Sequence, residues 1–222
     1  PEAEERIILR DCVLAEETGG HVHIQHVTTR RGVEIIRAAK SGGAPVTAEG
    51  CPHHFTLTDE AIREHGTNAK MNPPLRTAGD RAGIIEGLAD GTLDAIATDH
   101  APHAADEKAQ GMKSAPFGIT GLELCVPLTW TSLVRRGHLS DAEAVRKLTT
   151  VPASILRAPA PRLEVGGPAD ITVIDPDMRM VVTADHIHSK SHNTPFLGET
   201  LTGWPVLTIC DGRETFRRGS HA

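Results

Sequence analysis

At residues 93–103 the chain reads LDAIATDHAPH, an apolar run that ends in a cluster of acidic and imidazole side chains. Two shorter runs of the same kind precede it, HVHIQHV at 21–27 and PVTAEG at 45–50. Segments with the periodicity and glycine stops of amphipathic helices lie before and between these predicted strands, at 2–17, 32–40 and 80–89. This alternation predicts βαβ units with a parallel sheet, and further helices are expected near 121–136 and 140–149.

Polar side chains gather where these three predicted strands end. They are His26 after the first strand, His53 and His54 after the second, and Asp99, His100 and His103 after the third. In a (β/α)8 barrel the carboxyl ends of the strands meet at one mouth, where active sites lie. Three consecutive strands that end in His or Asp favour such a site more strongly than any one of them would.

A carboxylate followed by two imidazoles, as in TDHAPH, suits a divalent metal such as zinc. The alternative is that Asp99 caps a turn while the histidines face solvent, but an unpaired carboxylate after an apolar strand would be costly. Taken alone, His26 is equally typical of a satisfied core imidazole. His53 and His54 are interpreted as loop residues that are either merely polar or, for one of them, in contact with residues of the site rather than with the ligand. Cys51 is interpreted as a packed small residue.

Two further segments are candidates for binding a ligand. In MNPPLR (71–76) two prolines stiffen the backbone around Asn72, whose amide offers both a donor and an acceptor, as a cyclic amide edge requires. The alternative is a plain rigid turn. The segment KAQGMKSAPFG (108–118) is either a lid that contacts a ligand through Phe117 and Gly118 or an ordinary surface loop.

The composition excludes several classes of function. The 222 residues are 39% hydrophobic and 23% charged, which is ordinary for a globular protein. The net charge of −6 shows no excess of basic residues for binding nucleic acid. No apolar run approaches the ~18 residues of a membrane span. Four widely spaced cysteines form no disulfide or zinc-ribbon pattern. We expect a cytoplasmic protein with a small-molecule substrate and without nucleic-acid or membrane partners.

The residue pattern changes after about residue 160, where short β-rich runs alternate with Gly, Pro and Asp. Prolines at 152, 159 and 161 mark the join. We therefore expect an α/β fold of two parts. Residues 1–159 would be the C-terminal part of a (β/α)8 TIM-type barrel, and residues 160–222 a small, sandwich-like β-rich domain.

Five segments together resemble the dihydroorotases of the metal-dependent amidohydrolase superfamily. They are ATDHAPHAADEK (97–108), KMNPPLR (70–76), APFG (115–118), the HIQHVTT strand (23–29) and the E-x-x-P-H-H pattern of 49–54. The resemblance extends to GGPADITVID and NTPFLGETLTGWP in the β-rich part. It implies reversible cyclisation of N-carbamoyl-L-aspartate to dihydroorotate in de novo pyrimidine biosynthesis.

The resemblance also implies roles for individual residues. Asp99 would be a metal ligand and the general acid/base, and His26 a metal ligand, with one or two Zn²⁺ ions per complete site. The substrate contacts would be Asn72, His103, Phe117 and Gly118, with His103 at the substrate carboxylate. A homodimer is expected, with aspartate carbamoyltransferase as a possible partner.

The family's initial strand, which carries H-x-H-x-R, has no counterpart at a suitable place in this chain. HVH at 21–23 has the H-x-H part of this motif, but the arginine does not follow and the segment belongs to the His26 strand. We therefore expect the C-terminal part of the enzyme, with an incomplete metal site in this chain alone. The alternatives are an inactive dihydroorotase-like scaffold that partners aspartate carbamoyltransferase, or another cyclic amidohydrolase of dihydropyrimidinase or allantoinase type.

Overall fold

The first sheet of the molecule is parallel, as the sequence predicts. The computed structural model describes residues 1–219 and orders the strands β1 (Val22–Ile24), β2 (Val46–Gly50) and β3 (Ala95–Ile96) side by side. Val22 pairs with Val46, and Glu49 pairs with Ala95. β3 is far shorter than the strand predicted over 93–103, because the chain leaves the sheet before it turns at Asp99, whose φ is 47°.

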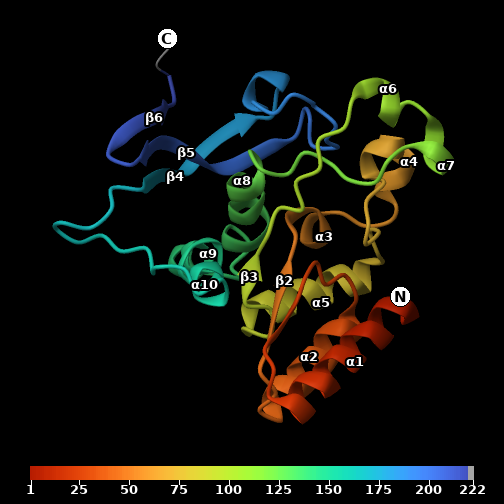
Figure 1. Cartoon of the computed structure of the whole chain (residues 1–222). Helices are drawn as coiled ribbons and strands as arrows, with labels where there is room; N and C mark the ends of the chain where they lie inside the picture. Colours follow the sequence, from red (N-terminus) through yellow and green to blue (C-terminus); the bar gives the residue numbers. More distant parts are fainter. Residues whose placement is uncertain (220–222) are drawn as a thin grey trace.

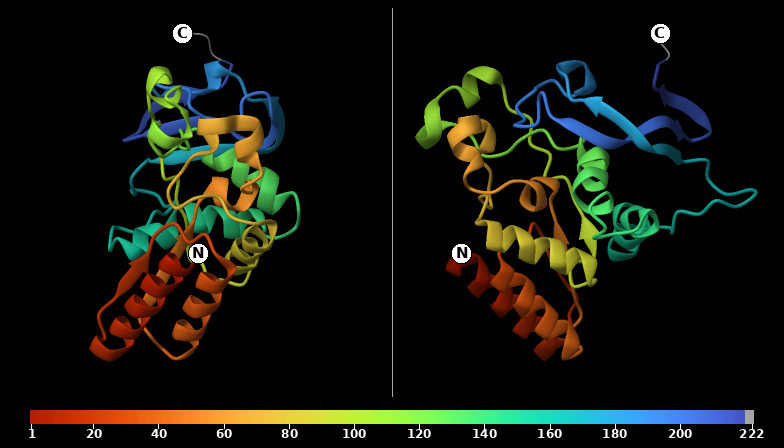
Figure 2. Two further views of the ribbon diagram at one scale, coloured as in Figure 1. Left: turned by 90° about the vertical axis from the view of Figure 1, so that its right-hand side faces the viewer. Right: turned by 180° about the vertical axis from the view of Figure 1, so that it is seen from behind.

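Three long helices accompany this sheet: α1 (Glu2–Thr18), α2 (Arg30–Ser41) and α5 (Ala78–Ala89). Their ends follow from local chemistry, since Gly19 closes α1 with a φ of 69° and the Thr29 hydroxyl caps α2 by accepting from Gly32 N. The helices α1 and α2 lie side by side, and α2 also packs against α5 (Figures 1 and 2). The predicted helices are confirmed to within two residues at each of these ends.

Short helices follow the carboxyl ends of β2 and β3. They are α3 (Pro52–Thr56), α4 (Ala61–His65), η1 (Gly66–Ala69), α6 (Ala105–Lys108) and α7 (Gly111–Ser114). The helices predicted near 121–136 and 140–149 are found as α8 (Cys125–Thr129), the π-helical turn η2 (Trp130–Val134) and α9 (Asp141–Leu148), followed by α10 (Thr150–Ile155). These connections carry most of the polar side chains that the sequence analysis singled out.

The second sheet is antiparallel and is formed by β4 (Ile171–Val181), β5 (Thr200–Cys210) and β6 (Arg213–Arg217), with the turn η3 (Ala184–His186) after β4. Within residues 1–219 this part is one antiparallel sheet, so a β-rich unit is present and its sandwich-like arrangement stays a prediction. Helices supply the opposing layer, because β5 packs on α8 and η2. At Gly203 a Cβ would lie 2.3 Å from Trp130, so only glycine allows this approach.

The core consists of two apolar clusters, and the second of them joins the two parts. One lies among β1, β2, α2 and α5 and contains buried residues such as Val33, Ile36 and Leu88. The other joins the connection after β2 to the second sheet through Met71, Leu128, Phe196 and Trp204. The segment between β4 and β5 is thereby fixed over the segment that follows β3 (Figure 1). In the described part of the chain, no helix combines the length and the apolar character that a bilayer crossing requires.

Candidate active site

His26 and Asp99 face each other across the carboxyl ends of the parallel sheet. Both have left-handed backbone conformations, with φ of 53° and 47°, although neither is a glycine. Such conformations are strained for L-residues and concentrate at functional sites. His26 Nε2 lies 3.7 Å from Asp99 Oδ1, and both side chains are about a quarter exposed. The two predicted metal ligands are therefore neighbours at one accessible point.

Glu49, from β2, orients His26. Its Oε1 lies 2.8 Å from His26 Nδ1, and its Oε2 lies 3.0 Å from His23 Nε2. Burial opposes the charge on Glu49, but the hydrogen bonds with His23 and His26 lower its pKa to about 2. The same hydrogen bond raises the pKa of His26. With Nδ1 engaged by the carboxylate, Nε2 is the ring nitrogen of His26 that could serve the predicted metal coordination.

His53 and His54 are not the polar loop residues that the sequence suggested. They lie in α3 and are only 1% and 4% exposed. Burial lowers the pKa of His54 to about 4, and its Nε2 donates to Pro73 O over 3.0 Å. Burial also lowers the pKa of His53 well below its usual value. His53 Nε2 lies 3.9 Å from Asp99 Oδ2 and has no hydrogen-bond partner among residues 1–219.

This donor set fits a divalent metal. His26 supplies an imidazole nitrogen and Asp99 a carboxylate, which are zinc ligands, and the orphaned His53 nitrogen faces the same carboxylate. Cys51, His53 and His54 also form a tight group of potential ligands. Burial raises the pKa of the Cys51 thiol well above its usual value, however, which disfavours the thiolate that a metal requires. The prediction that Cys51 is packed is confirmed, since it is fully buried.

Asn72 lies beside His26 in a cavity of about 470 Å³. Ile7 and Ile8 of α1, His23 and Ile24 of β1, and Pro73, Pro74 and Arg76 of the proline turn are among its other lining residues. Arg76 is anchored by Glu4, which its Nη2 reaches over 3.0 Å. Asn72 is exposed and shares this cavity with a predicted metal ligand.

The other predicted substrate contacts form a second group. His103 Nε2 donates to Phe117 O over 2.9 Å, and Asn193 Oδ1 accepts from His103 N over 3.0 Å. Phe117 is 55% exposed, while Gly118 is buried with a φ of 113°. A Cβ on Gly118 would lie 2.4 Å from that of Ala101. The segment of 108–118 is thus anchored rather than free, with α6 and α7 within it.

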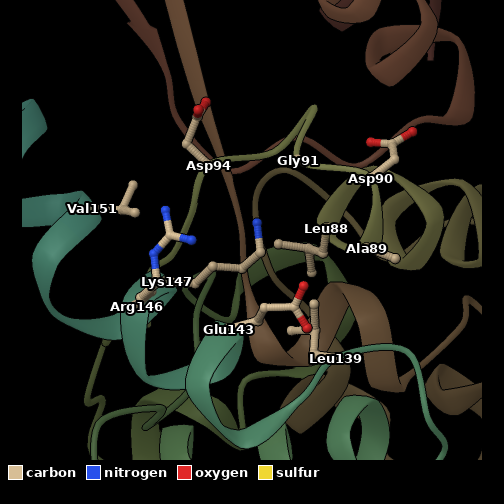
Figure 3. Close-up of a pocket in the computed structure, with 10 residues that line it drawn as sticks. All are labelled: Leu88, Ala89, Asp90, Gly91, Asp94, Leu139, Glu143, Arg146, Lys147 and Val151. Carbon is tan, nitrogen blue, oxygen red and sulfur yellow. The ribbon is translucent and has the colours of Figure 1, made fainter.

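A different cavity, of about 270 Å³, lies at the amino end of β3 (Figure 3). Its charged groups are already engaged, since Lys147 Nζ donates to Leu93 O over 2.6 Å and Asp94 accepts from Lys40 at the same distance. Asp94 and Asp99 lie at opposite ends of β3. These contacts lie at the amino ends of the strands, whereas His26 and Asp99 follow the carboxyl ends.

Residues 5–215 match the model of the amidohydrolase family, and the chain belongs to that family. Amidohydrolases generally use metal ions, in agreement with the group of potential ligands at this site. Among solved structures, the chain resembles the L-hydantoinase (dihydropyrimidinase) of Arthrobacter aurescens with a TM-score of 0.91 and 30% identity, over 98% of this chain and 49% of that one. A dihydropyrimidinase from Brevibacillus agri, 22% identical, shares the fold with a TM-score of 0.93, over 100% of this chain and 50% of that one.

The resemblance to dihydroorotases is confirmed by curated proteins of that name. One from Pelotomaculum thermopropionicum is 54% identical over 95% of this chain and 49% of its own length. Another, from Syntrophotalea carbinolica, is 53% identical over 97% of this chain and 50% of its own length. The chain therefore spans about half the length of the curated relatives it matches.

Proposed function

We propose that this chain forms part of a dihydroorotase, which cyclises N-carbamoyl-L-aspartate reversibly to dihydroorotate in de novo pyrimidine biosynthesis. The observation that carries the proposal is the identity of 46–54% with curated dihydroorotases over almost the whole chain. The pairing of His26 with Asp99 at the strand ends supports it, because this reaction needs a metal and a general base together.

In the ring-opening direction of the proposed reaction, water attacks the amide carbon of the ring, and Asp99 accepts its proton and returns it to the departing amide nitrogen; cyclisation reverses these transfers and releases the water. Burial raises the pKa of Asp99, and Glu49 adds to that effect against the opposing influence of His26. His26 and Asp99 would hold one or two Zn²⁺ ions, and the other ligands would come from residues other than these two. When bound, zinc supplies a Lewis acid that activates water and polarises a carbonyl oxygen.

The proposed substrate contacts are Asn72, His103, Phe117 and Gly118. Asn72 matches the donor and acceptor edge of the cyclic amide. His103 Nε2 donates to Phe117 O, and its Nδ1 lies 3.8 Å from Glu107 Oε2. Nδ1 can therefore donate to a carboxylate only when the ring carries both protons. In this arrangement the protonated His103 contacts the substrate carboxylate, and the backbone of Phe117 and Gly118 borders the ring, with Phe117 N as the donor that has no acceptor among residues 1–219.

At the scale of domains, we propose that residues 1–159 are the C-terminal part of a (β/α)8 barrel and residues 160–222 a small β-rich domain. The three adjacent parallel strands and the TM-scores near 0.9 against hydantoinases support this assignment. A cytoplasmic homodimer, with aspartate carbamoyltransferase as an additional partner, completes the proposal.

A hydantoinase or dihydropyrimidinase activity is the second candidate, favoured by the solved structures that the chain resembles. The product of the native gene, loaded with zinc, distinguishes the two through its kcat/KM for dihydroorotate and for dihydrouracil, which lacks the carboxylate. A dihydroorotase should prefer dihydroorotate by at least about 10²-fold, as expected when a site built for a charged group meets an analogue without it. Preference for dihydrouracil would instead assign the second activity.

A further inference from the structure

Lys108, at the end of α6, is a buried cation near the proposed substrate contacts. It is 4% exposed, and among residues 1–219 no carboxylate forms an ion pair with it. Its Nζ donates instead to Pro116 O over 3.1 Å and to Gly118 O over 2.9 Å. Burial, together with the neighbouring Lys70, lowers the pKa of Lys108. Burying an ammonium group without a counter-ion costs free energy of desolvation. We therefore ask what Lys108 contributes at this position.

The carbonyl groups that Lys108 holds belong to residues 115–118, here called the APFG loop. Every carbonyl oxygen of this loop accepts a hydrogen bond from a side chain. Ala115 O accepts from Lys70, Phe117 O from His103 over 2.9 Å, and Gly118 O also from Asn193 over 3.2 Å. All four oxygens are therefore engaged by side-chain donors.

Unlike its carbonyl oxygens, the backbone N–H groups of the APFG loop do not all have hydrogen-bond partners among residues 1–219. Gly118 N donates to Lys70 O over 2.9 Å, and Ala115 N donates to Gly111 O over 2.9 Å. Phe117 N has no acceptor among residues 1–219. Because N–H and C=O point in opposite directions in a trans peptide, the Phe117 N–H points away from Lys108, which holds the oxygen of the same peptide group.

A cation on a carbonyl oxygen polarises the whole peptide group and strengthens its N–H as a donor. Such a donor gains most from an acceptor that is itself charged. The loop also has little freedom to reorient, because Gly118 packs directly on Ala101. Lys108 thus favours an anionic acceptor at Phe117 N while remaining out of contact with the ligand itself.

We propose that Lys108 is a positioning residue that makes this site select carboxylate-bearing cyclic amides, by fixing the APFG loop and polarising the Phe117 amide. The proposal rests on the proposed function, of which it names a specificity determinant that is separate from His103. Asn193, from the segment between β4 and β5, assists by donating to both Ala101 O and Gly118 O.

The test compares Lys108→Met with Lys108→Arg in the zinc-loaded product of the native gene. Calorimetry gives the Kd for dihydroorotate, and competition gives that for the uncharged dihydrouracil. Lys108→Met should weaken dihydroorotate binding about 10- to 100-fold, which corresponds to one hydrogen bond to a charged group. Dihydrouracil binding should change less than about threefold. Lys108→Arg should restore most of the loss, and Lys113→Met, at an exposed lysine of α7, should change neither.

Equal losses for the two ligands would show a merely structural role and overturn the proposal, as would unchanged dihydroorotate affinity. If Lys108→Met does not fold, Lys108→Gln removes the charge while keeping a donor, and the same unequal loss is expected. Turnover of the wild-type protein is measured separately. Its absence would refute the proposed function, whereas the Kd values would still decide the role of Lys108; failure of the wild-type protein to bind dihydroorotate would overturn both.

Discussion

At the scale of single residues, His26 and Asp99 combine a left-handed backbone conformation, which Arg157 and Asp211 also have, with side chains that lie 3.7 Å apart. Each is held in the left-handed region, where a non-glycine residue costs of order 1–3 kcal/mol. Neighbours compensate for this strain, since Glu49 fixes one ring nitrogen of His26 and Val27 N donates to Glu49 O over 3.1 Å. The side chains are thus directed at each other before any ligand arrives.

Glu49 should therefore determine metal affinity without being a ligand. Replacing it as Glu49→Gln leaves the shape but removes the charge that orients His26, and partners of this kind are worth about 10- to 100-fold in metal affinity. We expect a loss of that size in a zinc competition assay with a chromophoric chelator. Glu86→Gln, at an exposed carboxylate that pairs with Arg30, is the matched control. Equal zinc affinity for wild type and Glu49→Gln would remove Glu49 from this role.

At the scale of elements, periodicity and glycine stops located the long helices and predicted the parallel sheet, whose strand order β1-β2-β3 comes from the structure. The same signals missed α3, because Pro52 was interpreted as a turn rather than as the first residue of a helix. Burial of His53 and His54 follows from that helix and has no signal in the sequence. The sequence predicted the β-rich character of the second part, whose sandwich-like arrangement stays a prediction. It did not predict that α8 and η2 pack on β5, because strand patterning does not indicate which element covers a sheet.

Gly203 in β5 marks the tightest contact between the two parts. Gly203→Ala should destabilise the protein by about 1–3 kcal/mol more than Gly198→Ala, because an added Cβ would overlap Trp130 only at the first position. Both glycines have positive φ, 82° and 87°, so the backbone strain is matched and the difference isolates the overlap. Urea denaturation of both variants measures it, and equal midpoints would contradict this packing.

At the scale of the whole molecule, the order of the first sheet leaves an open edge. β1 pairs with β2 on one side, and its other side has no strand partner within residues 1–219. The cavity beside it is lined by apolar side chains of α1 and β1, including Ile7 and Ile24. Exposed strand edges next to apolar surface favour association with further chain. The unpaired edge is consistent with the comparison, in which this chain spans about half the length of its curated relatives.

The 222-residue chain expressed by itself should accordingly be poorly stable or self-associating. The unpaired edge of β1 and the exposed apolar side chains of α1, Leu9 and Leu14 among them, are the reason. Sedimentation velocity combined with thermal unfolding followed by circular dichroism tests this expectation. A monodisperse monomer with one cooperative unfolding transition would contradict it.

The most direct test of the central claim is the turnover of dihydroorotate by Asp99→Asn in the zinc-loaded product of the native gene. The substitution keeps the size of the side chain but removes the proton acceptor, so kcat should fall by at least about 10²- to 10⁴-fold while the fold, by circular dichroism, is unchanged. Asp106→Asn, at an exposed position in α6, should retain full activity. Wild-type turnover that survives in Asp99→Asn would contradict the account.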